Sequence, residues 1–123
     1  MSDANPPLRI AIVGPCASGK TTLANALRAS GYTVRQPAQE HSYVPNMWQR
    51  LTQPDLLIYL DVDYAAIQNR RPKMGGGQER LDEQQQRLAH ARQHCDIYLN
   101  TSDLTLEQVV AHVLDVLSGS SGG

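Results

Sequence analysis

Apolar residues form two alternating patterns along this chain. Short apolar stretches that are typical of buried strands occur at 8–13, 32–35, 55–60 and 96–99. Apolar residues at three- and four-residue spacing predict helices at 20–30, 63–70, 78–94 and 105–117. Strands that alternate with helices favour a parallel sheet with helices on both faces. The pattern therefore predicts a three-layer α/β fold with about four parallel strands.

Local signals refine this assignment. Thr105 and Gln108 match a capping box at the start of the last helix, and Asp63 can cap the helix over 63–70. The helix over 78–94 has few apolar positions, so we expect it to be mostly exposed. The segment 37–54 contains Pro37, Pro45 and Pro54 and should hold at most one or two helical turns.

The turn between the first strand and the first helix carries the clearest motif. It matches the phosphate-binding P-loop pattern G-x-x-x-x-G-K-[ST] in the order Gly14, Pro15, Cys16, Ala17, Ser18, Gly19, Lys20 and Thr21. Its glycines let successive backbone N–H groups point at one anion, and the helix N-terminus adds partial positive charge. Lys20 should reach the β- and γ-phosphates, the Thr21 hydroxyl should bind Mg²⁺, and Thr22 completes the predicted nucleotide-binding set. A chance glycine-rich turn is the alternative, which the strand-loop-helix setting disfavours.

Size, charge and cysteine content narrow the functional class. The 123 residues suffice for one domain, which we place at 1–117, with a flexible tail at 118–123. Eleven Lys and Arg against twelve Asp and Glu give a net charge of −1, which argues against general attraction to nucleic acid or an acidic membrane. The sequence shows no apolar run of membrane-spanning length, no signal-peptide pattern and only two cysteines, so we expect a cytoplasmic protein.

With the P-loop motif, three further segments resemble the P-loop nucleoside and nucleotide kinases, the deoxynucleoside kinases most of all. They are Glu40 with Trp48 eight residues later, PDLLIYLD at 54–61 with a helix ending in Arg70-Arg71, and CDIYLNTSDLTLEQV at 95–109. The resemblance covers most of 8–117 and implies a P-loop fold with the first strand central, between 32–35 and 55–60. It also implies that Glu40 is the base toward the acceptor hydroxyl and that Arg70 and Arg71 belong to a lid.

The chain is shorter than these kinases between 36 and 54, where the acceptor-binding insert and the strand bearing a Walker-B carboxylate are absent. Three functions therefore stay open. The first is Mg²⁺-dependent transfer of the γ-phosphoryl group of ATP to an unidentified small acceptor. The second is a nucleotide-binding regulatory module without transferase activity, and the third is slow hydrolysis of the triphosphate. A homodimer could supply the missing wall of the acceptor pocket.

Several residues have both a functional and a structural interpretation. Asp61 ends an apolar strand and imitates a Walker-B carboxylate that holds Mg²⁺, or it is a strand-end aspartate. Glu40 with His41 is a general-base pair or a polar loop segment. Arg70 and Arg71, ahead of the glycines at 75–77, are lid cations that stabilise the transferring group, or solvated helix charges.

The loop after the last strand bears on the choice of base. In the resembling kinases this loop lies against the base, so Asn100 and Asp103 are predicted base-side residues. Asn100-Thr101-Ser102-Asp103 also echoes the guanine-reading N-K-x-D pattern without its lysine, which leaves GTP open beside the preferred ATP. The structural alternative for Asp103 is a cap at the start of the final helix.

Overall fold

Four parallel strands form the central sheet of the computed structural model, which describes residues 8–73 and 75–122. The sheet order is β2-β1-β3-β4, and every neighbouring pair is parallel. The strands run over Arg9–Val13 (β1), Thr33–Arg35 (β2), Leu56–Asp61 (β3) and Ile97–Asn100 (β4). The expected α/β class, the four-stranded parallel sheet and the flanking of β1 by β2 and β3 are confirmed.

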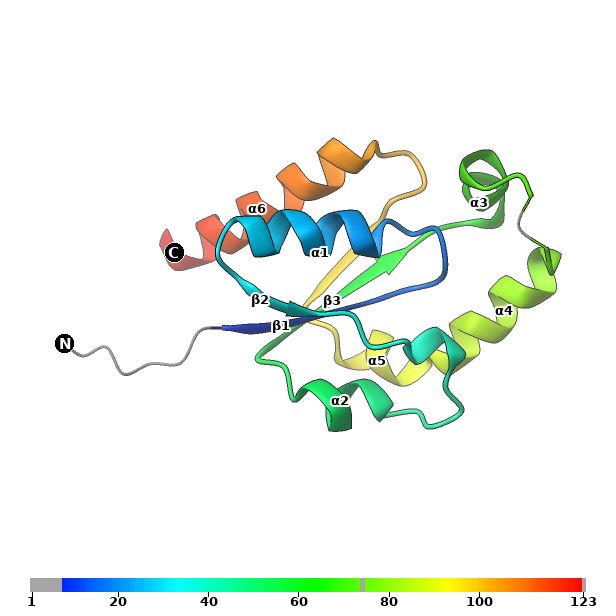
Figure 1. The fold of residues 1–123 in the computed structure, drawn as a ribbon, viewed down its shortest axis with the longest axis horizontal. Helices are drawn as coiled ribbons and strands as arrows, with labels where there is room; N and C mark the ends of the chain where they lie inside the picture. The colour runs from blue at the N-terminus through cyan, green and yellow to red at the C-terminus, as the bar shows by residue number, and fades with distance from the viewer. Residues whose placement is uncertain (1–7, 74, 123) are drawn as a thin grey trace.

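Helices cover both faces of the sheet, as alternate strand residues predict (Figure 1). On one face, α1 (Lys20–Ala29) and α6 (Leu106–Gly122) bury aliphatic side chains against Ile10, Ile12 and Ile58. On the other face, α2 (Met47–Thr52) buries Trp48 and α5 (Ala89–His94) buries Ala91 in a cluster with Ala11, Val13, Leu57 and Tyr59. Because β1 and β3 contribute to both clusters, the strands are held from two sides.

The polar segment after the glycines differs from the single helix that we expected over 78–94. It forms two helices, α4 (Gly77–Arg87) and α5, which meet at Leu88. Leu88 is fully buried in the cluster around Tyr59. Helix α5 packs against β3, whereas α4 packs against η1 (Gln39–His41) and α3 (Tyr64–Arg70). Most side chains in this segment are exposed as expected, but Gln84 is buried, with 3% of its surface exposed.

The ends of the remaining helices follow local chemistry. Asp63 caps α3 (Tyr64–Arg70) by accepting a hydrogen bond from the Ala66 N–H at 2.8 Å. Thr105 and Gln108 exchange the two hydrogen bonds of a capping box, at 2.9 and 3.1 Å, so this prediction is confirmed. The helix that follows, α6, continues past Leu117 to Gly122. The assignment of 118–123 to a flexible tail stays a prediction.

The proline-containing segment 37–54 holds only short helices. They are the 3-10 turn η1 (Gln39–His41) and α2, which agrees with the expected one or two turns. Among the described residues, no helix is both long and apolar enough to cross a membrane.

Candidate functional site

A cavity of about 590 Å³ lies where the chain leaves the carboxyl ends of the strands. Its wall includes the loop between β1 and α1, the segment after β2, the end of α3 and the start of α6. We call it the Lys20 cavity after its most central charged residue. Of the predicted site residues, those that line it are Cys16, Ala17, Ser18, Gly19, Lys20, Thr21, Thr22, Glu40, Arg70 and Arg71. The structure thus brings the motif together with the predicted base and both predicted lid arginines.

The loop from Gly14 to Gly19 has a backbone that few residues could adopt. Gly14 has φ 157°, and a Cβ there would lie 2.1 Å from the Leu60 carbonyl oxygen of the neighbouring strand. Gly19 has φ 101° and stands at the N-cap of α1, where no side chain caps the helix. The first N–H groups of a helix have no partner inside it. Since Gly19, Lys20 and Thr21 all line the cavity, α1 begins at the cavity wall with its amides uncapped by any side chain.

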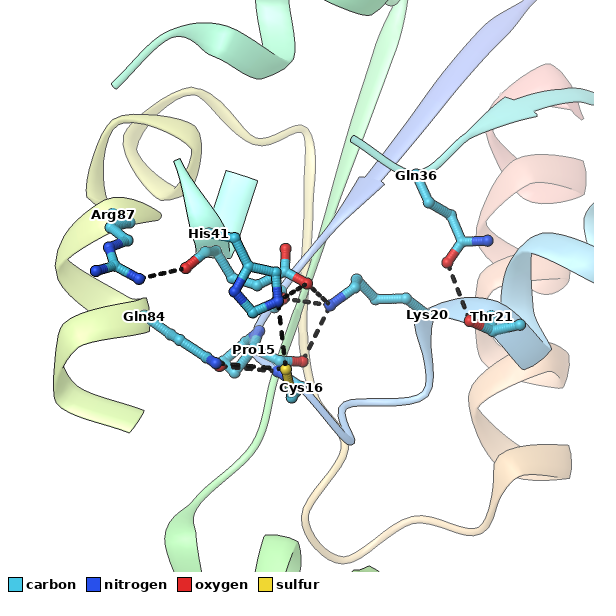
Figure 2. A network of polar contacts seen from close by, with 10 residues as sticks. Pro15, Cys16, Lys20, Thr21, Gln36, His41, Gln84 and Arg87 are labelled. Carbon is cyan, nitrogen blue, oxygen red and sulfur yellow. Dashed lines mark hydrogen bonds and ion pairs between the residues drawn. The ribbon is translucent and has the colours of Figure 1, made fainter. Parts of the chain in front are cut away.

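Lys20 is folded back onto its own loop and onto η1 (Figure 2). Its Nζ donates to the Gly14 and Pro15 carbonyl oxygens and lies 3.0 Å from Glu40 Oε2. Both members of this ion pair are largely shielded from water, because the Lys20 side chain is 12% exposed and the Glu40 side chain 8%. Lys20, the cation of the motif, is therefore already paired with Glu40, the predicted base.

The 3-10 turn places Glu40 by means of its neighbour. The side-chain amide of Gln39 donates to the Val44 and Arg87 carbonyl oxygens and accepts from the Trp48 N–H. In contrast, Glu40 Oε1 and Ser18 Oγ are buried and have no hydrogen-bond partner among the residues that the structure describes. Buried polar atoms without partners are uncommon in proteins. Ser18 and Glu40 line the Lys20 cavity, but these two atoms are themselves covered, so a ligand would reach them only after the side chains turn.

Trp48 does not take part in the cavity. Its side chain is buried against the sheet, and its indole N–H donates to His90 Nδ1 at 3.2 Å. Trp48 is linked to the segment of Glu40 by the hydrogen bond from its backbone N–H to Gln39. Its indole packs in the core and does not line the Lys20 cavity.

The two arginines at the end of α3 have different surroundings. The Arg70 guanidinium donates to the carbonyl oxygens of Ala17, Thr101 and Leu104, so it ties the loop to the segment after β4. Arg71 is exposed, and in the described part of the chain its side chain forms no hydrogen bond or ion pair. Arg70 thus acts as a brace inside the protein, whereas Arg71 is the cation that remains available to a ligand.

This difference predicts the effect of a conservative exchange. Arg70→Lys should lower the free energy of unfolding by about 1–3 kcal/mol, because one ammonium cannot replace a planar fork that reaches three carbonyl oxygens. Arg71→Lys, at an exposed side chain, should change it by less than about 0.5 kcal/mol. Urea denaturation of both variants measures the difference, and equal stability of the two would contradict the bracing role of Arg70.

Asp61 and Thr21, the two predicted metal ligands, are not both at the cavity. Asp61 lies outside its lining, and its carboxylate accepts from the Tyr98 hydroxyl, the Val62 N–H and the Gln85 amide. Burial, together with the hydrogen bond and negative charge of Asp61, raises the pKa of Tyr98, which keeps this donor protonated. The Thr21 hydroxyl lines the cavity and donates to Gln36 Oε1 at 3.2 Å. The carboxylate of Asp61 is thus used within the fold.

The segment after β4 lines the cavity, but not with the residues that we predicted. Asn100 and Asp103 are exposed and do not line it, whereas Leu104, Thr105 and Leu106 do. The Asn100 side chain accepts from the Ser102 N–H. Asp103 is not the cap of α6, because Thr105 occupies that position. The interpretation of Asp103 as a helix cap is therefore wrong.

Two structurally important residues carried no signal that we used in the sequence. Thr101 is fully buried, with its hydroxyl 2.9 Å from the Ser18 carbonyl oxygen and 3.1 Å from that of Asp61. Gln84 of α4 accepts from the Cys16 N–H at 3.0 Å and donates to Cys16 Sγ at 3.3 Å. Both residues hold the loop by hydrogen bonds, Thr101 through the Ser18 carbonyl oxygen and Gln84 through Cys16. A threonine directly after a strand is a weak pointer, and Gln84 is one of several glutamines in its helix.

No family model matches this chain, and no curated protein matches it either. The likeness to P-loop kinases therefore depends on the motif, the order of strands and the composition of the Lys20 cavity.

Proposed function

We propose that this protein is a small P-loop phosphotransferase that binds ATP and Mg²⁺ and transfers the γ-phosphoryl group to a hydroxyl of a small molecule. The observation that carries the proposal is the shared cavity of Lys20, Thr21, Glu40 and Arg71. A phosphate-binding cation, a hydroxyl suited to Mg²⁺, a carboxylate and a further cation are the groups that phosphoryl transfer to a hydroxyl requires.

The residues of the loop fit a polyphosphate. Gly14 allows the backbone to pass against Leu60, and the uncapped start of α1 offers N–H groups and partial positive charge to an anion. Ser18 Oγ is a buried hydroxyl in the same loop that still lacks a partner. Lys20 would contribute its charge to the β- and γ-phosphates once it leaves the Gly14 and Pro15 carbonyl oxygens.

Thr21 would hold Mg²⁺ through its hydroxyl, and Gln36 orients that hydroxyl in the structure described here. Bound Mg²⁺ neutralises charge on the phosphates. The exposed Arg71 would add a second cation beside them. Asn100 and Asp103 both lie outside the lining of the cavity, so ATP is proposed from the kinase resemblance.

Glu40 would accept the proton of the acceptor hydroxyl. In the described structure its carboxylate is neutralised by Lys20 at 3.0 Å. If Lys20 turns toward phosphate, Glu40 loses its partner and becomes a stronger proton acceptor in the same cavity. Binding of the nucleotide and activation of the base would thus be one event, which keeps the carboxylate neutralised until a phosphate is present.

A second candidate is a nucleotide-binding module without transferase activity. It is favoured by Asp61, whose carboxylate is engaged by Tyr98, Val62 and Gln85, so that Thr21 would be the single protein ligand of Mg²⁺ among the predicted ones. Mg²⁺ commonly keeps several waters and relies on substrate phosphates, so both candidates predict nucleotide binding.

Nucleotide binding is tested by thermal unfolding in the presence of Mg²⁺ with ATP, ADP, GTP or GDP. At a hundredfold excess over Kd, ATP should stabilise the protein by about 2.7 kcal/mol. Lys20→Met should lose most of this stabilisation, and Arg71→Met should lose part of it. Arg50→Met, at an exposed arginine outside the cavity, is the matched control and should respond like the parent. Absence of any shift with all four nucleotides would overturn the proposal.

Transfer is then separated from binding with γ-labelled ATP and pooled nucleosides, nucleotides and sugars. Label on an organic acceptor supports the phosphotransferase, whereas label that stays on ATP supports the binding module. Release of label as inorganic phosphate indicates hydrolysis. Glu40→Gln should lower transfer about 10²–10⁴-fold. Transfer at the parent rate would exclude Glu40 as the base.

A further inference from the structure

We propose a transition-metal site, suited to Zn²⁺, formed by Cys16, Glu40 and His41 at the edge of the Lys20 cavity. One donor atom from each of these residues lies within 4.8 Å of the other two. Two segments far apart in the sequence build the cluster, because Cys16 belongs to the loop after β1 and the other two residues belong to η1 (Figure 2). This site shares Glu40 with the proposed phosphotransferase site, but metal binding can be tested without any transferase activity.

The distances between the donor atoms suit a single small ion. His41 Nε2 lies 3.9 Å from Cys16 Sγ and 3.8 Å from Glu40 Oε2. A tetrahedral Zn²⁺ with bonds of about 2.3 Å to sulfur and 2.0 Å to nitrogen or oxygen holds its ligands about 3.3–3.5 Å apart. Movements of less than about 1 Å would therefore close the three donors around the ion. Thiolate, imidazole and carboxylate together favour Zn²⁺ over Mg²⁺ or Ca²⁺, which prefer oxygen ligands alone.

Glu40 provides an independent sign that this cluster is incomplete. Its side chain is 8% exposed, and its Oε1 is buried with no hydrogen-bond partner. A carboxylate oxygen in that condition is costly unless something binds it. A metal ion would satisfy this oxygen if it binds both carboxylate oxygens, Oε1 together with the Oε2 that faces His41.

Residues around the cluster hold the ligands in place. Gln84 accepts from the Cys16 N–H and donates to Cys16 Sγ, a contact that stabilises a thiolate. Arg87 donates to the Glu40 carbonyl oxygen at 3.3 Å and so helps fix η1. Outer contacts of this kind orient metal ligands in known sites. They also explain why Gln84 is buried and faces the loop, although most side chains of its helix are exposed.

The ion has a route to the site and a competitor within it. The His41 side chain is 50% exposed, which opens the cluster to solvent. Lys20 Nζ, at 3.0 Å from Glu40 Oε2, occupies the position of a counter-cation. Zn²⁺ would have to displace it, so Lys20 and the metal compete for one carboxylate. Three protein ligands leave a fourth position for water or for a ligand in the Lys20 cavity.

Binding exchanges a proton for the metal. The Cys16 S–H bond breaks, its proton passes to solvent, and the thiolate donates an electron pair to Zn²⁺ with no change of oxidation state. Affinity should therefore rise with pH, because protons and the metal compete for the same donor atoms. Sequence patterns did not reveal the site, because Cys16 and His41 lie 25 positions apart with no repeated ligand spacing.

The experiment uses the whole chain, reduced and freed of metal, with Co²⁺ as a coloured substitute and Zn²⁺ as the competitor. The parent should develop a thiolate-to-cobalt charge-transfer absorption that Zn²⁺ abolishes. Cys16→Ser should lose this absorption and bind Zn²⁺ about a hundredfold more weakly or worse. His41→Ala should weaken Zn²⁺ binding to a similar degree. The matched controls Cys95→Ser and His112→Ala should bind as the parent does.

Lys20→Met gives the second measurement. Removal of the competing charge should tighten Zn²⁺ binding about tenfold or more. Absence of the absorption in the parent, its survival in Cys16→Ser, its loss in Cys95→Ser, or equal Zn²⁺ affinity of Lys20→Met and the parent would each overturn the proposal. Circular dichroism of each variant confirms that a loss of binding does not come from unfolding.

Discussion

Gly14→Ala is expected to destabilise the protein by about 3 kcal/mol or more. A Cβ at this position would lie 2.1 Å from the Leu60 carbonyl oxygen and 2.9 Å from Ser18 Oγ. The first of these atoms is backbone in a central strand, so it cannot turn aside as a side chain would. Relief requires either β1 or β3 to move, and both strands are packed on two faces. The loss should appear as a fall in melting temperature of roughly 15 °C in calorimetry.

Gly75→Ala provides the matched control for this prediction. A Cβ at Gly75 would meet no atom within 4 Å, and its backbone is not in the left-handed region. It should therefore be neutral or slightly stabilising, because alanine restricts the unfolded chain more than glycine does. Similar melting temperatures of Gly14→Ala and Gly75→Ala would contradict the close contact of the loop with β3.

The sequence predicted the fold largely because each strand carries its own signal. Residues 55–60 form a continuous apolar run, and such a run can only be buried on both faces of a sheet. The central place of β1 between β2 and β3 was implied by the kinase resemblance and is observed, whereas the place of β4 beside β3 was not predicted. The break at Leu88 could not be predicted, since the helical spacing of Leu81, Leu88 and Ala91 continues across it. Leu88 and Ala91 pack in the cluster around Tyr59, whereas Leu81 packs with Val62 and Ile67.

The candidate site was predictable where a motif fixes the local backbone. Gly14 to Gly19 form one loop and Lys20 and Thr21 begin α1 directly after it, so their placement follows from the motif itself. Glu40 was found at the cavity because it follows a strand whose carboxyl end faces the same edge. Arg70, in contrast, has the same charge as Arg71, and nothing in the sequence tells which guanidinium turns to the backbone. Its role depends on three carbonyl oxygens from separate segments, which only the folded chain brings together.

The Lys20–Glu40 pair joins the stability of the loop to its chemistry. A buried cation and carboxylate neutralise each other, and removal of one leaves the other without a partner. A ligand that takes Lys20 must therefore supply enough interaction energy to compensate for the loss of the pair. An anion as highly charged as a triphosphate can do so, whereas a neutral ligand cannot. Selectivity for polyanions would thus follow from the same contact that holds the unliganded loop in place.

This pair should show strong coupling in a double-mutant cycle. Lys20→Met is expected to cost about 3 kcal/mol, since it leaves a buried carboxylate with one oxygen already unpartnered. Glu40→Gln should cost less, because Lys20 keeps the Gly14 and Pro15 carbonyl oxygens. The double variant should be more stable than the sum of the two losses predicts, with a coupling of about 1–3 kcal/mol. Urea denaturation of the four proteins gives this value.

The exposed pair Arg9–Asp55, at 3.8 Å, is the internal comparison. Both side chains are about half exposed, and the cycle of Arg9→Met with Asp55→Asn should give a coupling of about 0.5 kcal/mol or less. Equal couplings at the two pairs would mean that burial of Lys20 and Glu40 has no energetic consequence. If the Lys20→Met, Glu40→Gln protein is folded and yet unresponsive to ATP, the loss of binding comes from the missing cation. A response equal to that of the parent would instead remove Lys20 from the phosphate site while leaving its structural role intact.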